Sequence, residues 1–177
     1  MEKSKGKTMR KNVAIITCIA VLLLINYSIY SKEKHISEGQ VILLKLVPVD
    51  PRSLMQGDYM ALRFDIASVA YNAVEAAEPH LSHYELNYEG VLIVALDDNR
   101  VASFLRLDDE RAIGEGEAKM QFRIRTGVVK FATNAYFFQE GHADLYEKAK
   151  YGEFKVNSNG ELLLTALRDE KFVILGG

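Results

Sequence analysis

The first long feature of the hydrophobic pattern is a run of 20 residues, 12–31, that contains no charged side chain. At a rise of about 1.5 Å per residue, a helix of this length spans roughly the 30 Å hydrocarbon core of a bilayer. Asn26 interrupts the apolar pattern only near its far end, and Tyr27 and Tyr30 lie where aromatic side chains gather at a membrane interface. The pattern therefore predicts a transmembrane helix over residues 12–31.

The charges that flank this run predict its orientation. Five basic residues and one acidic residue precede it: Lys3, Lys5, Lys7, Arg10 and Lys11, with Glu2. By the positive-inside rule, residues 1–11 form a cytoplasmic tail and the rest of the chain lies on the periplasmic or extracellular side of the inner (cytoplasmic) membrane. The alternatives are a cleaved signal peptide, disfavoured by the bulky residues after the apolar centre, and a buried helix of a soluble protein, disfavoured by the basic flank.

After a polar spacer at residues 32–38, the apolar positions fall into short segments that are typical of strands, with two helical stretches between them. Turn residues separate several of these segments, as in Asp97-Asp98-Asn99, Thr126-Gly127 and Asn157-Ser158-Asn159-Gly160. We expect strands at 39–49, 58–66 (paired with 39–49), 91–96, 100–107, 120–125, 128–131, 154–156, 161–167 and 172–175, and helices at 67–78 and 140–150. The pattern predicts an α+β, mainly β fold over 39–177, an antiparallel sheet or open barrel with one or two short helices.

Composition narrows the classes of function. Hydrophobic residues make up 49% of the chain, enough for a buried core, and the one cysteine, Cys18, lies inside the predicted span. The predicted domain therefore has no disulfide. Residues 31–177 retain 17 of the 22 Lys and Arg and 23 of the 24 Asp and Glu, which gives a formal charge of −6. An acidic domain of this kind argues against nucleic acid as a partner.

The sharpest local motif is the segment from Gly57 to Phe64. A glycine allows a turn angle that other residues resist, and Asp58 can accept backbone N–H bonds in that turn. The structural interpretation is a well-specified entry into a strand. The functional interpretation is a site formed by Arg52, Asp58 and Tyr59.

This segment resembles the signature after which the GDYXXLXY family is named, with Gly57, Asp58, Tyr59 and Leu62 in place and Phe64 where the family has its last tyrosine. The lead-in at 46–54 and the segments 138–141, which contains Glu140 and Gly141, and 151–160 are similar to the family as well. The resemblance implies a membrane-anchored protein of unknown function, often encoded beside multi-pass membrane proteins. It makes Glu140 and Gly141 a second candidate contact surface.

Other motifs suggest chemistry only weakly. Pro51, Leu54, Gly57 and Asp58 resemble the segment after the nucleophile of type I signal peptidases, but Pro48 stands where that family has its serine, so we reject a protease. His80 and His83 are a close pair of possible metal ligands with no third histidine nearby, and surface histidines are the simpler interpretation. We expect no catalytic set, no metal site and no cofactor.

Two functions follow as expectations. The first is a non-enzymatic envelope protein, held in the bilayer by residues 12–31, whose exported domain binds a multi-pass membrane protein. The alternative is an unrecognised enzyme or small-ligand binder with a site around the Gly57-Asp58-Tyr59 turn.

Overall fold

The computed structural model describes residues 2–47, 55–56, 59–77 and 87–176, with side chains from Arg10 onward apart from Met55 and Gln56. The chain divides into two compact units, Met1–Ser37 and Glu38–Gly177.

The first unit is a single long helix, α1 (Glu2–Glu38). Its segment Arg10–Glu38 is long and apolar enough to cross a membrane, and its large aliphatic side chains point outward, from 46% exposed at Ile36 to 69% at Leu24. The polar Asn26 bonds within the helix, because its Nδ2 donates to the Leu22 carbonyl at 2.8 Å. Residues 32–38 continue the helix, so they add about 10 Å along its axis, less than the roughly 20–25 Å of an extended spacer.

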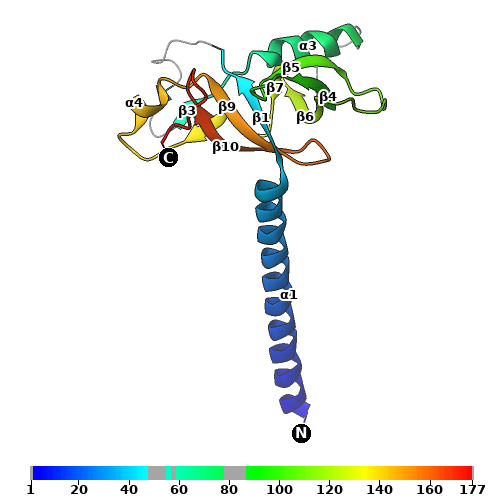
Figure 1. The fold of residues 1–177 in the computed structure, drawn as a ribbon. Coiled ribbons are helices and arrows are strands. Elements are labelled where there is room, and N and C mark those ends of the chain that lie inside the picture. Colours follow the sequence, from blue (N-terminus) through cyan, green and yellow to red (C-terminus); the bar gives the residue numbers. More distant parts are fainter. Residues whose placement is uncertain (1, 48–54, 57–58, 78–86, 177) are drawn as a thin grey trace. The chain divides into compact units, whose positions relative to one another are not determined.

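The second unit contains three antiparallel sheets (Figure 1). In order across each, the first sheet is β1-β9-β10, the second β2-β3-β8 and the third β5-β4-β6-β7. The strands are β1 (Gln40–Lys45), β2 (Met55–Gln56), β3 (Tyr59–Ala61), β4 (Tyr88–Leu96), β5 (Ala102–Leu107), β6 (Glu117–Arg125), β7 (Val128–Lys130), β8 (Ala135–Phe137), β9 (Tyr151–Val156) and β10 (Leu162–Arg168). The predicted apolar helix followed by a mainly β fold is confirmed, and the described strands close no barrel.

Several elements differ from the pattern-based expectation. The strand expected at 58–66 is reduced to β3, which pairs with β2 and β8. Among the described residues, the predicted pairing with 39–49 is found after β3, where the Val47 N–H donates to the Arg63 carbonyl and the Asp65 N–H to the Lys45 carbonyl, both at 2.9 Å. The helix α4 (Ala143–Tyr146) is shorter than the expected 140–150, and the expected last strand makes one bridge, between Arg168 and Ile174.

One apolar core joins the three sheets. The first sheet contributes the fully buried Ile42 and Phe154, the third Leu92 and Met120, and the second Met60, which is 5% exposed. The helix α3 (Ile66–Ala77), which confirms the helix expected at 67–78, contacts β5 and β7. It buries Ile66, Ala70, Tyr71 and Val74, a spacing that places them on one helical face.

A buried ion pair within the first sheet also bonds the segment that follows β10. Glu153 on β9 is 6% exposed and accepts a bond at 2.6 Å from Nε of Arg168 on β10 and another at 2.9 Å from the Thr165 hydroxyl. Arg168 also donates through Nη1 to the Phe172 carbonyl at 2.6 Å. The burial of this carboxylate is therefore compensated by a cation and a hydroxyl.

Candidate functional site

The signature segment, Gly57 to Phe64, contributes side chains to the core. Leu62 is 2% exposed and Phe64 is 3% exposed. The Phe64 ring meets the rings of Phe131 and Phe154 edge-on, with centroids 5.9 and 5.5 Å away. These two signature positions therefore specify packing, and a ring without a hydroxyl suits the apolar surroundings of residue 64.

Of the signature positions Tyr59, Leu62 and Phe64, Tyr59 is the one that reaches the surface. It is half-buried and lies directly across from Phe137 on β8, with the ring centroids 5.7 Å apart. Phe137 is 74% exposed, and β8 is an edge strand among the described strands of the second sheet. We call Tyr59 and Phe137 the aromatic pair.

The neighbours of Phe137 hold β8 in place from the other side. Side chains alternate along a strand, so Tyr136 and Phe138 point away from the aromatic pair. Both rings pack on Tyr146 of α4, at centroid distances of 5.2 and 5.0 Å. Burial is the main reason why the pKa of Tyr136 is raised, and the nearby Tyr146 adds to the effect. The exposed Phe137 is thus displayed from a strand with a well-packed inner face.

Glu140 and Gly141 form the turn that leads into α4. Gly141 has φ +81°, and the His142 N–H closes the turn on the Gln139 carbonyl at 3.1 Å. The open space around Gly141 means that the backbone angle, and not crowding, favours glycine here. Within the described part of the chain, the exposed Glu140 side chain has no hydrogen bond or ion pair.

The other residues singled out from the sequence, Arg52, Gly57, Asp58, His80 and His83, lie outside the described residues. Of the residues expected around that turn, the structure places Tyr59 and Leu62. Over the ranges that the structure describes, no group of three His, Cys, Asp or Glu residues could hold a metal ion.

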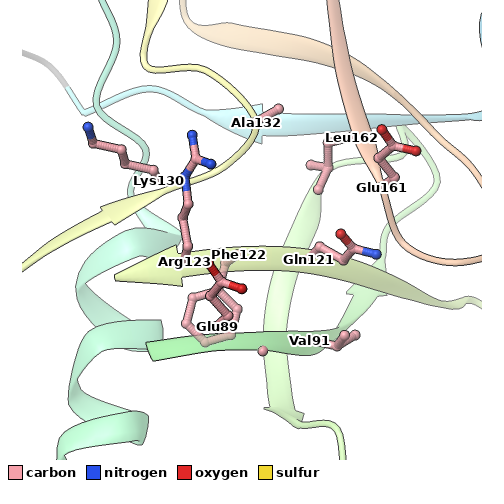
Figure 2. A pocket seen from close by; sticks show the side chains of 10 residues that line it. Glu89, Val91, Gln121, Phe122, Arg123, Lys130, Ala132, Glu161 and Leu162 are labelled. Atoms are coloured by element: carbon pink, nitrogen blue, oxygen red, sulfur yellow. The ribbon is translucent and has the colours of Figure 1, made fainter. Parts of the chain in front are cut away.

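A second surface feature is a hollow of about 580 Å³ on the third sheet (Figure 2). Strands β4, β6 and β7 and the start of β10 supply its walls. We call it the basic hollow, and its lining residues are Glu89, Gly90, Val91, Gln121, Phe122, Arg123, Lys130, Ala132, Glu161 and Leu162.

The alternation along β6 and the turn after it position the basic residues of this hollow. Along β6, Met120, Phe122 and Ile124 are buried while Gln121, Arg123 and Arg125 are exposed. Thr126 and Gly127 have φ of +50° and +74°, the positive angles of a two-residue type I′ turn. That turn fixes the register between β6 and β7 and sets Arg123 directly opposite Lys130.

The charges around these two residues are distributed unevenly. Glu89 faces Arg123 across β4 and β6, but its carboxylate forms an ion pair with Arg125. Among the described residues, the side chains of Arg123 and Lys130 make no hydrogen bond or ion pair. Figure 2 shows the two side chains on neighbouring strands at one end of the hollow, with Lys130 extending outward from the other lining residues.

The far end of the hollow is closed by the turn between β9 and β10. The Gln121 N–H donates to the Gly160 carbonyl at 2.7 Å, and the Gln121 side-chain amide donates to the Asn159 carbonyl at 3.0 Å. Figure 2 shows Glu161 at this end, away from Arg123 and Lys130. The hollow therefore has polar side chains at both ends, with its unpaired positive charge at one of them, and apolar residues such as Val91 and Leu162 between.

Beyond the hollow, an ion-pair network covers the same face of the sheet. Lys119 Nζ lies 3.0 Å from Asp108, and Arg106 lies 2.6 Å from Asp109. The hydrogen bond from Lys119 is the main reason why the pKa of Asp108 is lowered. The pKa of Asp109 is lowered chiefly by its hydrogen bond with Arg111. These charges are matched, in contrast to Arg123 and Lys130.

Sequence reasoning did not single out Phe137, Arg123 or Lys130. The alternation along 120–125 and the Thr126-Gly127 turn together contain the signal for Arg123 and Lys130, since a two-residue turn fixes which residues face each other. The exposure of Phe137 had no such signal, because it lies in an aromatic run, 136–138, of which the other two members are packed inward.

Comparison with known proteins bears on the family. Neither the curated proteins nor the solved structures include a match to this chain. The family model described as GDYXXLXY protein matches residues 21–167, which is most of the chain and includes β1 to β9 and nearly all of β10. The chain belongs to the GDYXXLXY family.

Proposed function

We propose that this chain is a non-enzymatic envelope protein, anchored by α1, whose β domain lies on the exported side of the membrane and binds a multi-pass membrane protein through the aromatic pair. The observation that carries the proposal is the exposure of Phe137, 74%, beside the signature residue Tyr59. Large aromatic side chains that stand on a rigid surface are the residues that most often dominate protein interfaces.

The connection between the units supports a partner in or near the bilayer. Only Gly39 separates the last residue of α1 from the first residue of β1. With residues 32–38 helical, the chain between the predicted span and the domain is about 10 Å long. A domain on so short a connection has a high local concentration near other proteins of the same membrane.

The aromatic pair fits an interface better than a core. Burying an exposed phenylalanine contributes about 1.5–3 kcal/mol. The inner face of β8 is already packed on Tyr146 by Tyr136 and Phe138, so Phe137 is left for an external contact. The family resemblance implies that multi-pass membrane proteins are often encoded beside such a chain, and a protein of that kind would supply the external contact.

The experiment is photo-crosslinking in intact cells, with a photoreactive amino acid placed at residue 137 of the full chain. We expect a crosslink from residue 137 to a multi-pass membrane protein, which co-purifies with the wild type in mild detergent. The substitution Phe137→Ser should reduce this recovery by roughly tenfold or more, as expected for an interface residue of about 2 kcal/mol.

Val173 provides the matched control, because it is an apolar residue of similar exposure, 57%, in the C-terminal segment. The photoreactive residue at 173 should give no such crosslink, and Val173→Ser should leave recovery unchanged. Recovery of the protein alone in several detergents, or equal crosslinking from positions 137 and 173, would refute the proposal.

A further inference from the structure

Two cations face each other in the basic hollow without an acidic partner. Arg123 and Lys130 are opposite one another in the β6–β7 register, and like charges in directly opposed positions destabilise a sheet. Within the described residues, neither forms an ion pair or a side-chain hydrogen bond. A bound anion would neutralise both at once.

The nearest acids do not fill this role. Glu89 lies opposite Arg123 but forms its ion pair with Arg125, and Glu161 is at the other end of the hollow, where it accepts a bond from Asn157 Nδ2 at 3.2 Å. Two carboxylates on the rim disfavour a ligand with several negative groups. The ligand should therefore carry one compact anionic group, placed between Arg123 and Lys130.

The residue types indicate which anion. A guanidinium presents a planar set of donors that matches the oxygens of a phosphate, and a lysine adds a mobile point charge. The hollow, at about 580 Å³, falls in the range of small-molecule sites and is larger than a lone phosphate ion requires. The Gln121 and Glu161 end would then contact a polar, uncharged or cationic remainder of the ligand.

We infer that the basic hollow is a binding site for a phosphate group carried by a small molecule or by a lipid headgroup, with Arg123 and Lys130 as the residues that hold it. This site lies on the third sheet, whereas the aromatic pair lies on the second, so the inference does not depend on the proposed protein partner.

The test uses the full chain in dodecyl maltoside micelles, which contain neither phosphate nor charge, and follows the backbone amide resonances of β6 and β7 by NMR. In one arm inorganic phosphate replaces chloride, so that the ionic strength stays constant. In the other, phosphatidylglycerol is added to the micelles without free phosphate. We expect saturable shifts at Arg123 and Lys130 in at least one arm, and the arm that gives the tighter binding identifies the source of the phosphate.

The substitutions Arg123→Gln and Lys130→Gln should each weaken this binding by roughly tenfold to a hundredfold, the range for a lost bond to a charged group. Arg100→Gln and Lys148→Gln remove the same charges from exposed positions elsewhere and should bind as the wild type does. Unchanged resonances in the rest of the domain show that each variant is folded. The absence of saturable shifts in both arms, or equal loss in all four variants, would overturn the inference.

Discussion

At the scale of single residues, Gly152 shows how tightly Phe64 of the signature segment is packed. It lies on β9 beside the aromatic centre of the core, and a Cβ at this position would come within 3.0 Å of Phe64 Cε1 and 3.3 Å of Phe154 Cε2. Real side chains rarely approach so closely. The close approach to Phe64, and not an unusual backbone angle, therefore favours glycine at residue 152.

We expect Gly152→Ala to lower the free energy of unfolding by about 1–3 kcal/mol, the usual cost of an extra methyl group in a packed core. Chemical denaturation of the full chain in micelles, followed by tyrosine fluorescence, measures this quantity. Combining it with Phe64→Leu should cost less than the sum of the two single changes, because the two residues are in contact.

Gly114→Ala is the matched control. Gly114 is exposed, and its added Cβ would meet only the flexible side chain of Glu117. The change should leave the free energy of unfolding within about 0.5 kcal/mol of the wild type. If Gly152→Ala were equally harmless, the packing of Phe64 against β9 would be looser than the distances imply.

At the scale of elements, the Asp108–Lys119 pair ties the end of β5 to β6. Lys119 Nζ lies 3.0 Å from the Asp108 carboxylate, and this bond is the first cause of the lowered pKa of Asp108. A carboxyl whose pKa is lower in the folded than in the unfolded chain stabilises the fold at pH values above its ordinary pKa, here 3.8. That contribution is lost as the pH falls through the lowered pKa.

The substitution Lys119→Gln should therefore reduce the stability at pH 7, and the difference from the wild type should shrink as the pH falls below 3.8 and Asp108 becomes protonated in both proteins. Denaturation curves between pH 7 and pH 2 test this. Lys148→Gln, at an exposed position with no ion pair among the described residues, should show no such convergence. A difference that stays constant with pH would mean that Lys119 stabilises the sheet by packing alone.

At the scale of the whole molecule, the surface of α1 is the feature that bears on membrane anchoring. Its exposed apolar side chains, such as Leu23 at 66%, have no protein surface of their own unit to cover them. Water is a poor environment for such a surface, and a bilayer is a favourable one. The same helix is long enough to cross it.

Leu23→Arg should therefore impair membrane insertion, since a charge near the centre of a span costs about 2.5–3.5 kcal/mol. Extraction with alkaline carbonate should release part of this variant while the wild type stays in the membrane. Ser31→Arg, at the end of the span, should remain as firmly anchored as the wild type. A reporter enzyme fused after Gly177 should be active only outside the cytoplasm, and activity only inside would reverse the proposed orientation.

Much of this protein was predictable from the sequence because the interactions concerned are local. The uncharged run at 12–31 predicts the apolar helix through its length, and the turns at 97–99 and 157–160 predict two hairpins through residues that favour turn angles. The helix at 66–77 is predicted at 67–78 by its alanine-rich composition and the proline that follows.

Only the tertiary structure decided which of these positions are buried and which come together. Phe64 is a core residue because Phe154 of β9 and Phe131, just after β7, pack against its ring, and that packing joins segments about 70–90 residues apart in the chain. The basic hollow likewise combines Glu89 of β4, Arg123 of β6 and Glu161 of the turn before β10, which are far apart in the sequence. Alternation tells which side chains share a face of a strand, but the choice of the face to be buried depends on what the rest of the chain can cover.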